Sequence, residues 1–465
     1  MKIINIKTLV VLAVILPALS SCNIYKPYKT PEVKTDDLYR TDAAPADTTN
    51  MALMPWQELF TDPNLRELID SALTNNFDYR TAIYKVEEAN AAFAQGRAAF
   101  FPTLNLSPSG TLTEVQDLPH SESYNLSAVA SWEIDIFGRL RSAKRAAKAA
   151  LLQSIAYKRA VETQMVASVA NGYYTLLSLD KQLAIYDQTI ILWTETVSKM
   201  EAMMEAGSAT LAAVEQSRAN LYSAQAARQD ILYNIRATEN SLRLLVGLPA
   251  GSITRGTFED QTLTSDLHIG VPSQLLANRP DVQQAESGVR YAFAKTNVAR
   301  AAFYPKFTIT ATGGYANDAT VSFSPRFFGN FVAGILQPIF NGGVNRANLR
   351  IAKAQQEEAL LAFQKSLVGA GIEVSNILYN YSTTTEKLDA RQKQVASLES
   401  AVYATNELFK LDTKTSYLEV LTAQQSLLNA QIGQIGDQLA QLQNVVNLYQ
   451  ALGGGWERPV EKEKK

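Results

Sequence analysis

Four short stretches of the chain alternate between polar and apolar residues, the period of β-strands whose two faces differ. The pattern is clearest at 124–137, where Trp132 and Ile134 oppose Glu133 and Asp135. Strands of about ten residues with one polar and one apolar face are typical of transmembrane β-barrels, although a soluble hairpin over a core has the same pattern. The predicted strands cover about 103–113, 124–137, 306–316 and 327–338.

Two very long stretches contain no proline: 129 residues after Pro119 and 120 residues after Pro338. Apolar positions in the first follow a seam typical of coiled coils. We therefore predict a helix over about 140–205, a break near Gly207 and a return over 210–245. The seam residues step by three, four, three and seven: Val166, Val169, Tyr173, Leu176 and Leu183.

The chain contains two copies of one unit. The run RAAFFP at 97–102 returns as RAAFYP at 300–305, at an offset of 203 residues. Each copy reads as a helix, a proline-ended junction, alternating strands and a long helical run, and such repeats guide the division of a chain. We divide the sequence into a signal peptide (1–21), an N-terminal strap (22–60), a first repeat (61–250), a linker (251–275), a second repeat (276–457) and a charged tail (458–465).

Four strands are too few to close a membrane barrel, since the smallest known barrels have eight. If these strands cross a membrane, several copies of the chain must associate. A dimer would give eight strands and a filled interior, whereas a trimer would give twelve strands and room for a duct.

The N-terminus predicts export and lipid attachment. Lys2 and Lys7 precede an eleven-residue apolar run at 9–19, which is shorter than a membrane-spanning helix and typical of a secretory signal. The run Leu19-Ser20-Ser21-Cys22 resembles the bacterial lipoprotein signal, in which the cysteine is acylated. Cys22 is the only cysteine, which excludes an intramolecular disulfide. A plain secretory signal with a cysteine near the cut is the alternative.

Charge and motifs exclude other classes. The chain has 43 basic and 45 acidic residues and no basic run, so nucleic acid is not an expected partner. His120 and His268 are the only histidines, and no HExxH, GxSxG or Gly-Lys phosphate-loop motif occurs. We therefore expect no enzyme activity, metal site or cofactor, and any transport must draw its energy from a partner protein.

Five kinds of motif occur along the chain: both RAAFFP-type junctions, WEIDIFGR (132–139), GLP (247–249), LLANRPDV (275–282) and QPIFNGG (337–343). They resemble the motifs of the TolC/OprM-like outer-membrane efflux proteins. The resemblance runs from about residue 60 to 456, in the family's order and spacing.

The resemblance implies a mixed, mainly α fold. Long coiled-coil-like helices would form a periplasmic barrel, and four transmembrane strands per subunit would form a twelve-stranded barrel as a homotrimer. Such proteins are passive outer-membrane exit ducts of tripartite efflux systems, docked on a periplasmic adaptor and, indirectly, an inner-membrane pump. The lipidated branch resembles that of resistance–nodulation–division systems. A duct for type I protein secretion and a non-conducting periplasmic coiled-coil lipoprotein are the alternatives.

The resemblance places the functional residues at the turns between the long helices. The candidate adaptor contacts are Gly207 and Ser208 in the first copy and Asp412, Thr413 and Lys414 in the second.

The run SYLEVLT (416–422) resembles the family's SYLDVLDA stretch, whose acids ring the closed entrance in many members. It makes Glu419 and Thr422 the candidate periplasmic gate, although Thr422 stands where the family has a second acid and the first copy has Ala213 opposite Glu419. A solvated helix carboxylate is the other interpretation of Glu419.

The RPD motif at 279–281 has a structural explanation. Pro280 suits the first turn of a helix, and Asp281 favours the positive end of the helix dipole. We therefore expect this motif to support the fold.

Overall fold

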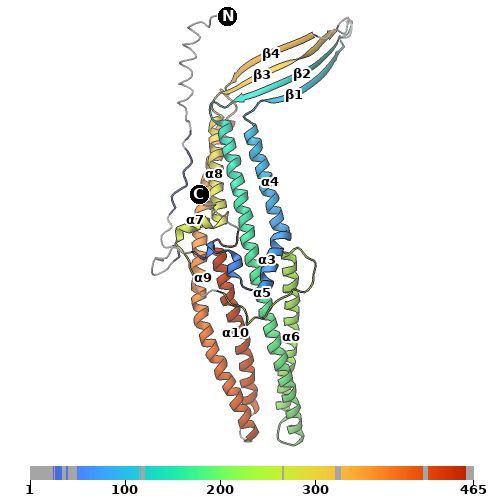
Figure 1. The fold of residues 1–465 in the computed structure, drawn as a ribbon, viewed down its shortest axis with the longest axis vertical. Coiled ribbons are helices and arrows are strands. Elements are labelled where there is room, and N and C mark those ends of the chain that lie inside the picture. The colour runs from blue at the N-terminus through green and yellow to red at the C-terminus, as the bar shows by residue number, and fades with distance from the viewer. Residues whose placement is uncertain are drawn as a thin grey trace, which may run out of the picture. The chain divides into compact units, whose positions relative to one another are not determined.

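A computed structural model describes residues 25, 27–33, 38–39, 50–114, 116, 121–263, 267–319, 326–411 and 417–456 (Figure 1). Cys22, Asp412, Thr413, Lys414, the predicted signal peptide and the charged tail lie outside these described residues. The chain divides into two compact units, each of which takes in segments of both sequence copies. The first unit comprises Met1–Val33, Tyr84–Ile155 and Gln284–Lys365, and the second comprises Lys34–Ile83, Ala156–Gln283 and Ser366–Lys465.

The first unit contains a four-stranded antiparallel sheet in the order β1-β2-β3-β4. The pairing of β2 with β3 joins the two sequence copies, in a register that runs from Ile134 opposite Phe307 to Glu122 opposite Ala319. The strands are β1 (Thr103–Thr113), β2 (Ser121–Ile134), β3 (Lys306–Ala319) and β4 (Arg326–Leu336).

The second strand lies three residues earlier than its predicted range. It ends at Ile134 because the next residue, Asp135, turns its carboxylate to the start of a helix and accepts hydrogen bonds from the backbone N–H groups of Leu140 (2.9 Å) and Arg141 (2.8 Å). Gly138, with φ 74°, completes the turn. Ile136 and Phe137 therefore belong to this turn and not to the strand.

The strands of the second copy also differ at their ends. β3 continues to Ala319, three residues beyond the predicted range, and β4 ends at Leu336. Gln337 uses its side-chain amide to donate to the Phe303 carbonyl (3.0 Å), and Pro338 has no N–H to donate to a ladder. The proline-ended junctions therefore fasten the strand ends to the preceding helices.

Two long helices contribute residues to both units. α5 (Arg139–Glu205) has 67 residues and α9 (Val344–Leu411) has 68, each close to 100 Å at about 1.5 Å per residue. Two helices, α4 (Phe77–Ala98) and α8 (Pro280–Ala301), lead to β1 and β3. In Figure 1, α6 (Leu211–Leu245) runs beside α5, and α10 (Tyr417–Ala451) runs beside α9.

Shorter elements complete the second unit. Its 3-10 turns are η1 (Met51–Leu53) and η2 (Pro272–Gln274), and its short helices are α2 (Trp56–Leu59), α3 (Pro63–Asn75) and α7 (Leu275–Asn278). Two of these elements, η1 and α2, lie within the predicted strap, which therefore contains helical turns near its end.

The predicted seam of α5 forms the core of the second unit. Val166, Val169, Tyr173 and Leu176 are buried, and Leu183 packs against the cluster of Leu176. Leu176 meets Ile231, Ile235 and Leu242 of the returning helix α6. The predicted seam is therefore buried, and its Leu176 and Leu183 pack against α6.

Candidate functional site

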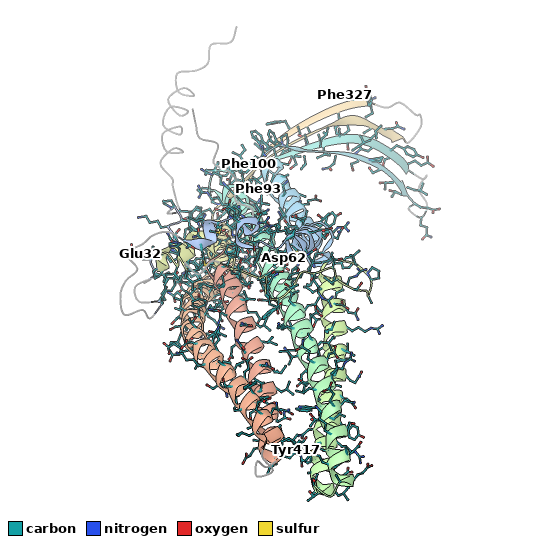
Figure 2. All side chains as sticks on the ribbon, turned by 60° about the horizontal axis from the view of Figure 1, so that its bottom comes forward. Glu32, Asp62, Phe93, Phe100, Phe327 and Tyr417 are labelled. Atoms are coloured by element: carbon teal, nitrogen blue, oxygen red, sulfur yellow. The ribbon has the colours of Figure 1, made fainter. Side chains whose placement is uncertain are left out.

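The sheet has two chemically different faces. The register places Leu104, Leu106 and Leu112 of β1 on the same face as Trp132 and Ile134 of β2, and the polar residues between them on the other face. The apolar side chains are exposed: Leu106 retains 69% of its surface and Phe331 of β4 also 69% (Figure 2 labels Phe327, on the same strand as Phe331). The apolar face continues across β3 and β4 through Phe307, Ile309, Tyr315, Phe327, Phe331 and Ile335.

Such a face is too extensive for a surface in water. Soluble monomers rarely expose contiguous apolar patches of this kind, and large ones mark contact with a membrane or a partner. The opposite face carries Thr103, Asn105, Ser107, Ser123, Asn125, Ser131, Thr308 and Thr310. One lipid-facing and one water-facing side is the arrangement of a transmembrane barrel wall.

Ion pairs lie on the polar face of the sheet, where β2 and β3 meet the start of α5. Glu133, the neighbour of Trp132 in β2, accepts two hydrogen bonds from the guanidinium of Arg139, at 2.8 and 2.7 Å. Lys306 of β3 lies 3.3 Å from the same carboxylate. These contacts fasten the start of α5 to the two central strands.

The turn between α5 and α6 contains two of the candidate adaptor contacts. Gly207 has φ 75°, and a Cβ added there would meet nothing within 4 Å. The backbone N–H of Ser208 donates to the Met203 carbonyl at 2.8 Å, and Gly207 donates to Met204 at 2.9 Å, which is the pattern of a glycine-ended helix. Both turn residues are exposed, so their surface is free to meet a partner.

The candidate gate residues lie near the start of α10. Glu419 and Thr422 are both exposed and three residues apart, so they share one side of the helix. The Thr422 hydroxyl donates back to the Leu418 carbonyl at 2.7 Å. Among the described side chains, no lysine or arginine pairs with Glu419 within 4.0 Å. The gate residue predicted from the sequence, Glu419, is therefore a solvent-exposed carboxylate on α10.

A hydrogen bond that the sequence did not predict joins the two helix pairs near their tips. The hydroxyls of Tyr417 (labelled in Figure 2) and Ser217 of α6 lie 3.0 Å apart. The Ser217 hydroxyl donates to the Tyr417 oxygen, and burial raises the pKa of the Tyr417 phenol. The Tyr417 ring also packs against Phe409 of α9, with centroids 5.7 Å apart.

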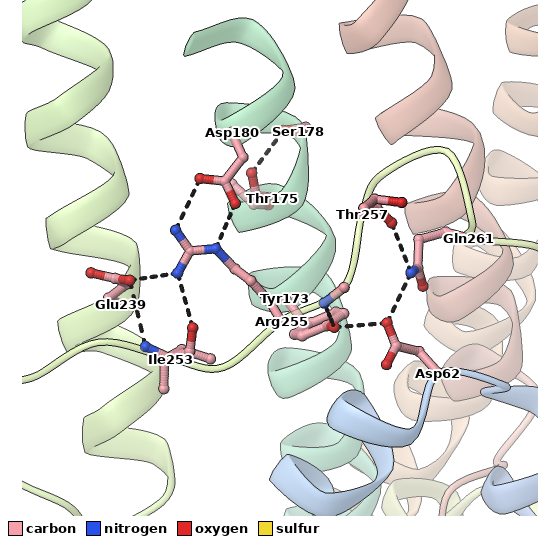
Figure 3. Close-up of polar contacts among 11 residues, drawn as sticks. Asp62, Tyr173, Thr175, Ser178, Asp180, Glu239, Ile253, Arg255, Thr257 and Gln261 are labelled. Atoms are coloured by element: carbon pink, nitrogen blue, oxygen red, sulfur yellow. Dashed lines mark hydrogen bonds and ion pairs between the residues drawn. The ribbon is translucent and has the colours of Figure 1, made fainter. Parts of the chain in front are cut away.

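Deeper in the second unit, a polar network anchors the segment that the sequence marked as a linker (Figure 3). The Arg255 guanidinium binds Asp180 of α5 at 2.5 and 2.9 Å and Glu239 of α6 at 2.5 Å. It also donates to the Ile253 carbonyl at 3.0 Å. The hydrogen bonds with Asp180 raise the pKa of Arg255 despite its burial, so the group remains a cation.

Asp62 is the centre of a second part of this network (Figure 3). Its carboxylate accepts from the Tyr173 hydroxyl (2.7 Å), the Gln261 amide (2.8 Å) and the backbone N–H of Asn64 (2.8 Å), and it thereby caps α3. Burial by itself would raise the pKa of Asp62, but these hydrogen bonds outweigh it and the pKa is lowered. In the sequence, the Asp62-Pro63 pair indicates the start of a helix, but no pattern indicates the distant partners Tyr173 and Gln261.

The RPD motif supports the fold in a further way. Pro280 is the first residue of α8, as expected, while Arg279 forms a bidentate pair with Asp281 at 3.0 and 2.7 Å. Its guanidinium also binds Glu373 of α9 and the Ala451 carbonyl of α10, at 2.7 and 2.8 Å. The arginine therefore ties three helices together.

Two general features bear on the chemistry. None of the helices in the described part of the chain has a segment long and apolar enough to cross a membrane. Across those same residues, no group of three or more His, Cys, Asp or Glu side chains is placed to hold a metal ion.

The sheet and its long helices define the class of outer-membrane channels with helical extensions, and comparison with known proteins agrees. The model of the family described as outer membrane efflux protein matches residues 68–248 and 271–454. The toluene efflux pump outer membrane protein TtgC of Pseudomonas putida is 30% identical over 97% of this chain and 96% of that protein. The cation efflux system protein CusC of Escherichia coli is 30% identical over 95% of this chain and 97% of its own length.

Further relatives agree in sequence and fold. The probable outer membrane lipoprotein SilC of Salmonella typhimurium is 30% identical over 98% of this chain and 99% of that protein. A crystal structure of CusC superposes with a TM-score of 0.84 at 29% identity, covering 93% of this chain and 100% of that one.

The chain belongs to the outer membrane efflux protein family, and it is an outer-membrane exit duct of an efflux system. Proteins of this family are channels and not enzymes.

Proposed function

We propose that the protein works as a homotrimer that forms a passive outer-membrane duct for small molecules. The observation that carries this proposal is the four-stranded sheet, whose edge strands β1 and β4 each have only one strand neighbour in the described chain. Three copies would supply twelve strands, enough to enclose a lumen lined by the polar face. Relatives named for toluene and for cation efflux favour small molecules as the cargo.

The duct needs partners that supply energy, because the sequence contains no nucleotide-binding motif. A periplasmic adaptor that engages the helix tips, and through it an inner-membrane pump, would fill this role. The exposed turn at Gly207 and Ser208, together with Asp412, Thr413 and Lys414 in the other turn, would form the contact surface.

We assign membrane attachment to acyl chains on Cys22. One acyl chain gives marginal binding, whereas several anchor a protein stably. The relative SilC is named a probable outer membrane lipoprotein, which supports the same modification here.

Glu419 is assigned to a closed periplasmic gate. In a trimer, three copies of this exposed carboxylate would stand in a ring, with Thr422 one turn further along α10. A ring of carboxylates attracts cations and is a recurrent selectivity element of pores. The hydrogen bond between Tyr417 and Ser217 would hold α10 against α6 in the closed state.

The first test is single-channel conductance of the purified protein in a planar bilayer, after native mass spectrometry has counted the subunits. We expect three subunits and a small, cation-selective conductance. Glu419→Ala should raise the conductance and reduce cation selectivity, because it removes the carboxylate ring.

The matched control is Glu205→Ala, which removes one exposed carboxylate at the other helix tip. Equal currents in wild type and Glu419→Ala would remove the gate assignment and leave the duct. A single or dimeric chain that carries no current, even with adaptor added, would overturn the trimeric duct.

A further inference from the structure

A stripe of cations follows the sheet end of α5. Lys144, Arg145 and Lys148 are spaced by one and three residues, and Arg141 lies one turn earlier, so the four share one side of the helix. Together with Phe93 of α4 and Phe100, in the turn that follows α4, they line a cavity of about 330 Å³ (both rings are labelled in Figure 2). We call Lys144, Arg145 and Lys148 the basic stripe.

Among the described residues, the basic stripe has no ion-pair partner. Arg141 pairs with Asp135 at 3.2 Å. In contrast, no carboxylate of the described residues lies within 4.0 Å of Lys144, Arg145 or Lys148. The Lys144 ammonium instead lies 5.6 Å from the centroid of the Phe100 ring. Three cations without a carboxylate partner beside an aromatic ring make a site that favours an anion.

Helix geometry places the basic stripe on the lipid side of the barrel wall. Arg139 binds Glu133, which belongs to the polar face of the sheet. Arg141 follows two residues later and projects about 200° around the helix from Arg139. The stripe that begins at Arg141 therefore points away from the polar face.

Contacts at the base of the sheet agree with this orientation. Trp132, on the apolar face, donates its indole N–H to the Phe100 carbonyl at 2.9 Å. The ring of Tyr25 and the guanidinium of Arg141 both lie against Gly138. Tyr25 is only three residues beyond Cys22, the proposed site of the acyl chains, so the same side of α5 is next to the membrane.

We propose that the basic stripe, with Phe93 and Phe100, binds the headgroup of an anionic glycerophospholipid in the periplasmic leaflet of the outer membrane. The proposal rests on the proposed function, because it uses the sheet as a membrane-spanning wall. Three cations next to a membrane-spanning element attract an anionic headgroup, and the two phenyl rings offer an apolar surface beside them. The lipid phosphate would meet the ammonium groups while its glycerol backbone lies over the two rings.

The test uses the purified full-length protein in dodecyl maltoside, with bound lipid counted by native mass spectrometry during titration with phosphatidylglycerol or phosphatidylcholine. We expect preferential binding of phosphatidylglycerol. The variant Lys144→Gln/Arg145→Gln/Lys148→Gln should weaken that binding by about tenfold or more, because each cation near the surface contributes on the order of a fivefold change in affinity.

A matched variant, Lys199→Gln/Arg236→Gln/Lys365→Gln, removes three exposed cations elsewhere and should bind phosphatidylglycerol as wild type does. The charge-conserving Lys144→Arg/Lys148→Arg variant should also keep the lipid. Its binding would show that the first variant loses lipid because of the missing charge and not because substitution at these positions disturbs the fold. Equal weakening in both triple variants would reduce the effect to net charge and overturn the site.

Inorganic phosphate separates a headgroup site from a free-anion site. Displacement of phosphatidylglycerol by millimolar phosphate would identify a general anion site and overturn the proposal. Undiminished lipid binding by the stripe variant would overturn it as well. Failure of the duct would instead be seen in the conductance of the wild-type protein, which this titration does not measure.

Discussion

Arg255 connects three segments of the chain through a single guanidinium group. Its partners Asp180 and Glu239 lie on α5 and α6, and its own segment crosses between them. Only 20% of its side chain is exposed, and Glu239 is more buried still, at 14%. Removing the cation would leave two carboxylates facing each other with little water to solvate them.

We expect Arg255→Met to destabilise the protein by about 2 to 3 kcal/mol. Loss of a partner from a fully buried pair costs about 3 to 5 kcal/mol, and the partial exposure of Asp180 lowers this figure. The midpoint of guanidinium unfolding measures the change. Arg218→Met, which removes an exposed cation that pairs with Glu201 and Glu215, is the control and should shift the midpoint little. Equal shifts in both variants would contradict the role given to burial.

The Asp62 carboxylate makes stability depend on pH. Its pKa is lower in the folded protein than in the unfolded chain, so it contributes stability above pH of about 4 and loses it as the pH falls through the folded pKa. We expect thermal unfolding of wild type and Asp62→Asn to differ at pH 7, and the difference to shrink as the pH falls below about 4. A difference that stays constant over this range would show that the carboxylate charge contributes nothing.

At the scale of elements, side chains alternate between the two faces of β1, so neighbouring residues have different surroundings. Leu106 lies on the apolar face and Ser107 on the polar face, near the middle of the strand. In a bilayer the first contacts lipid, whereas the second contacts water in the lumen.

We therefore expect Leu106→Arg to impair insertion, at a cost of about 2 to 4 kcal/mol for a charge near the bilayer centre. Ser107→Arg carries the same side chain on the adjacent residue and should insert as wild type does. Folding into phosphatidylcholine vesicles, followed by protection from protease, compares the two. Equal insertion of both variants would mean that the apolar face does not meet lipid.

How much the sequence predicted depends on whether the interaction is local. The strands, the seam of α5 and the break at Gly207 follow from periods and from turn chemistry, which act over a few residues. The end of β2 was misplaced because Asp135 caps α5, and this local helix cap ends the strand although the alternation of side chains continues. The bonds between Tyr417 and Ser217 and between Asp62 and Tyr173 join residues more than a hundred positions apart, and no local pattern encodes them.

At the scale of the whole molecule, the two compact units differ in what they present to their surroundings. The first holds the sheet, the basic stripe and the described residues nearest to Cys22. The second holds the helix tips and both polar networks. Membrane contact and partner contact are therefore assigned to different parts of one chain, which allows the conductance and lipid-binding experiments to be interpreted separately.

The pairing of β2 with β3 also sets the order of events during biogenesis. Ile134 pairs with Phe307, a separation of 173 residues (307 minus 134), and the intervening chain forms long helices. Pairings across such distances form slowly, because loop closure must precede any gain from contacts. The first hairpin must therefore wait, with its leucines uncovered, until most of the polypeptide has left the ribosome and crossed the inner membrane. A holding chaperone in the periplasm would be required over that interval, since exposed strands of this kind aggregate.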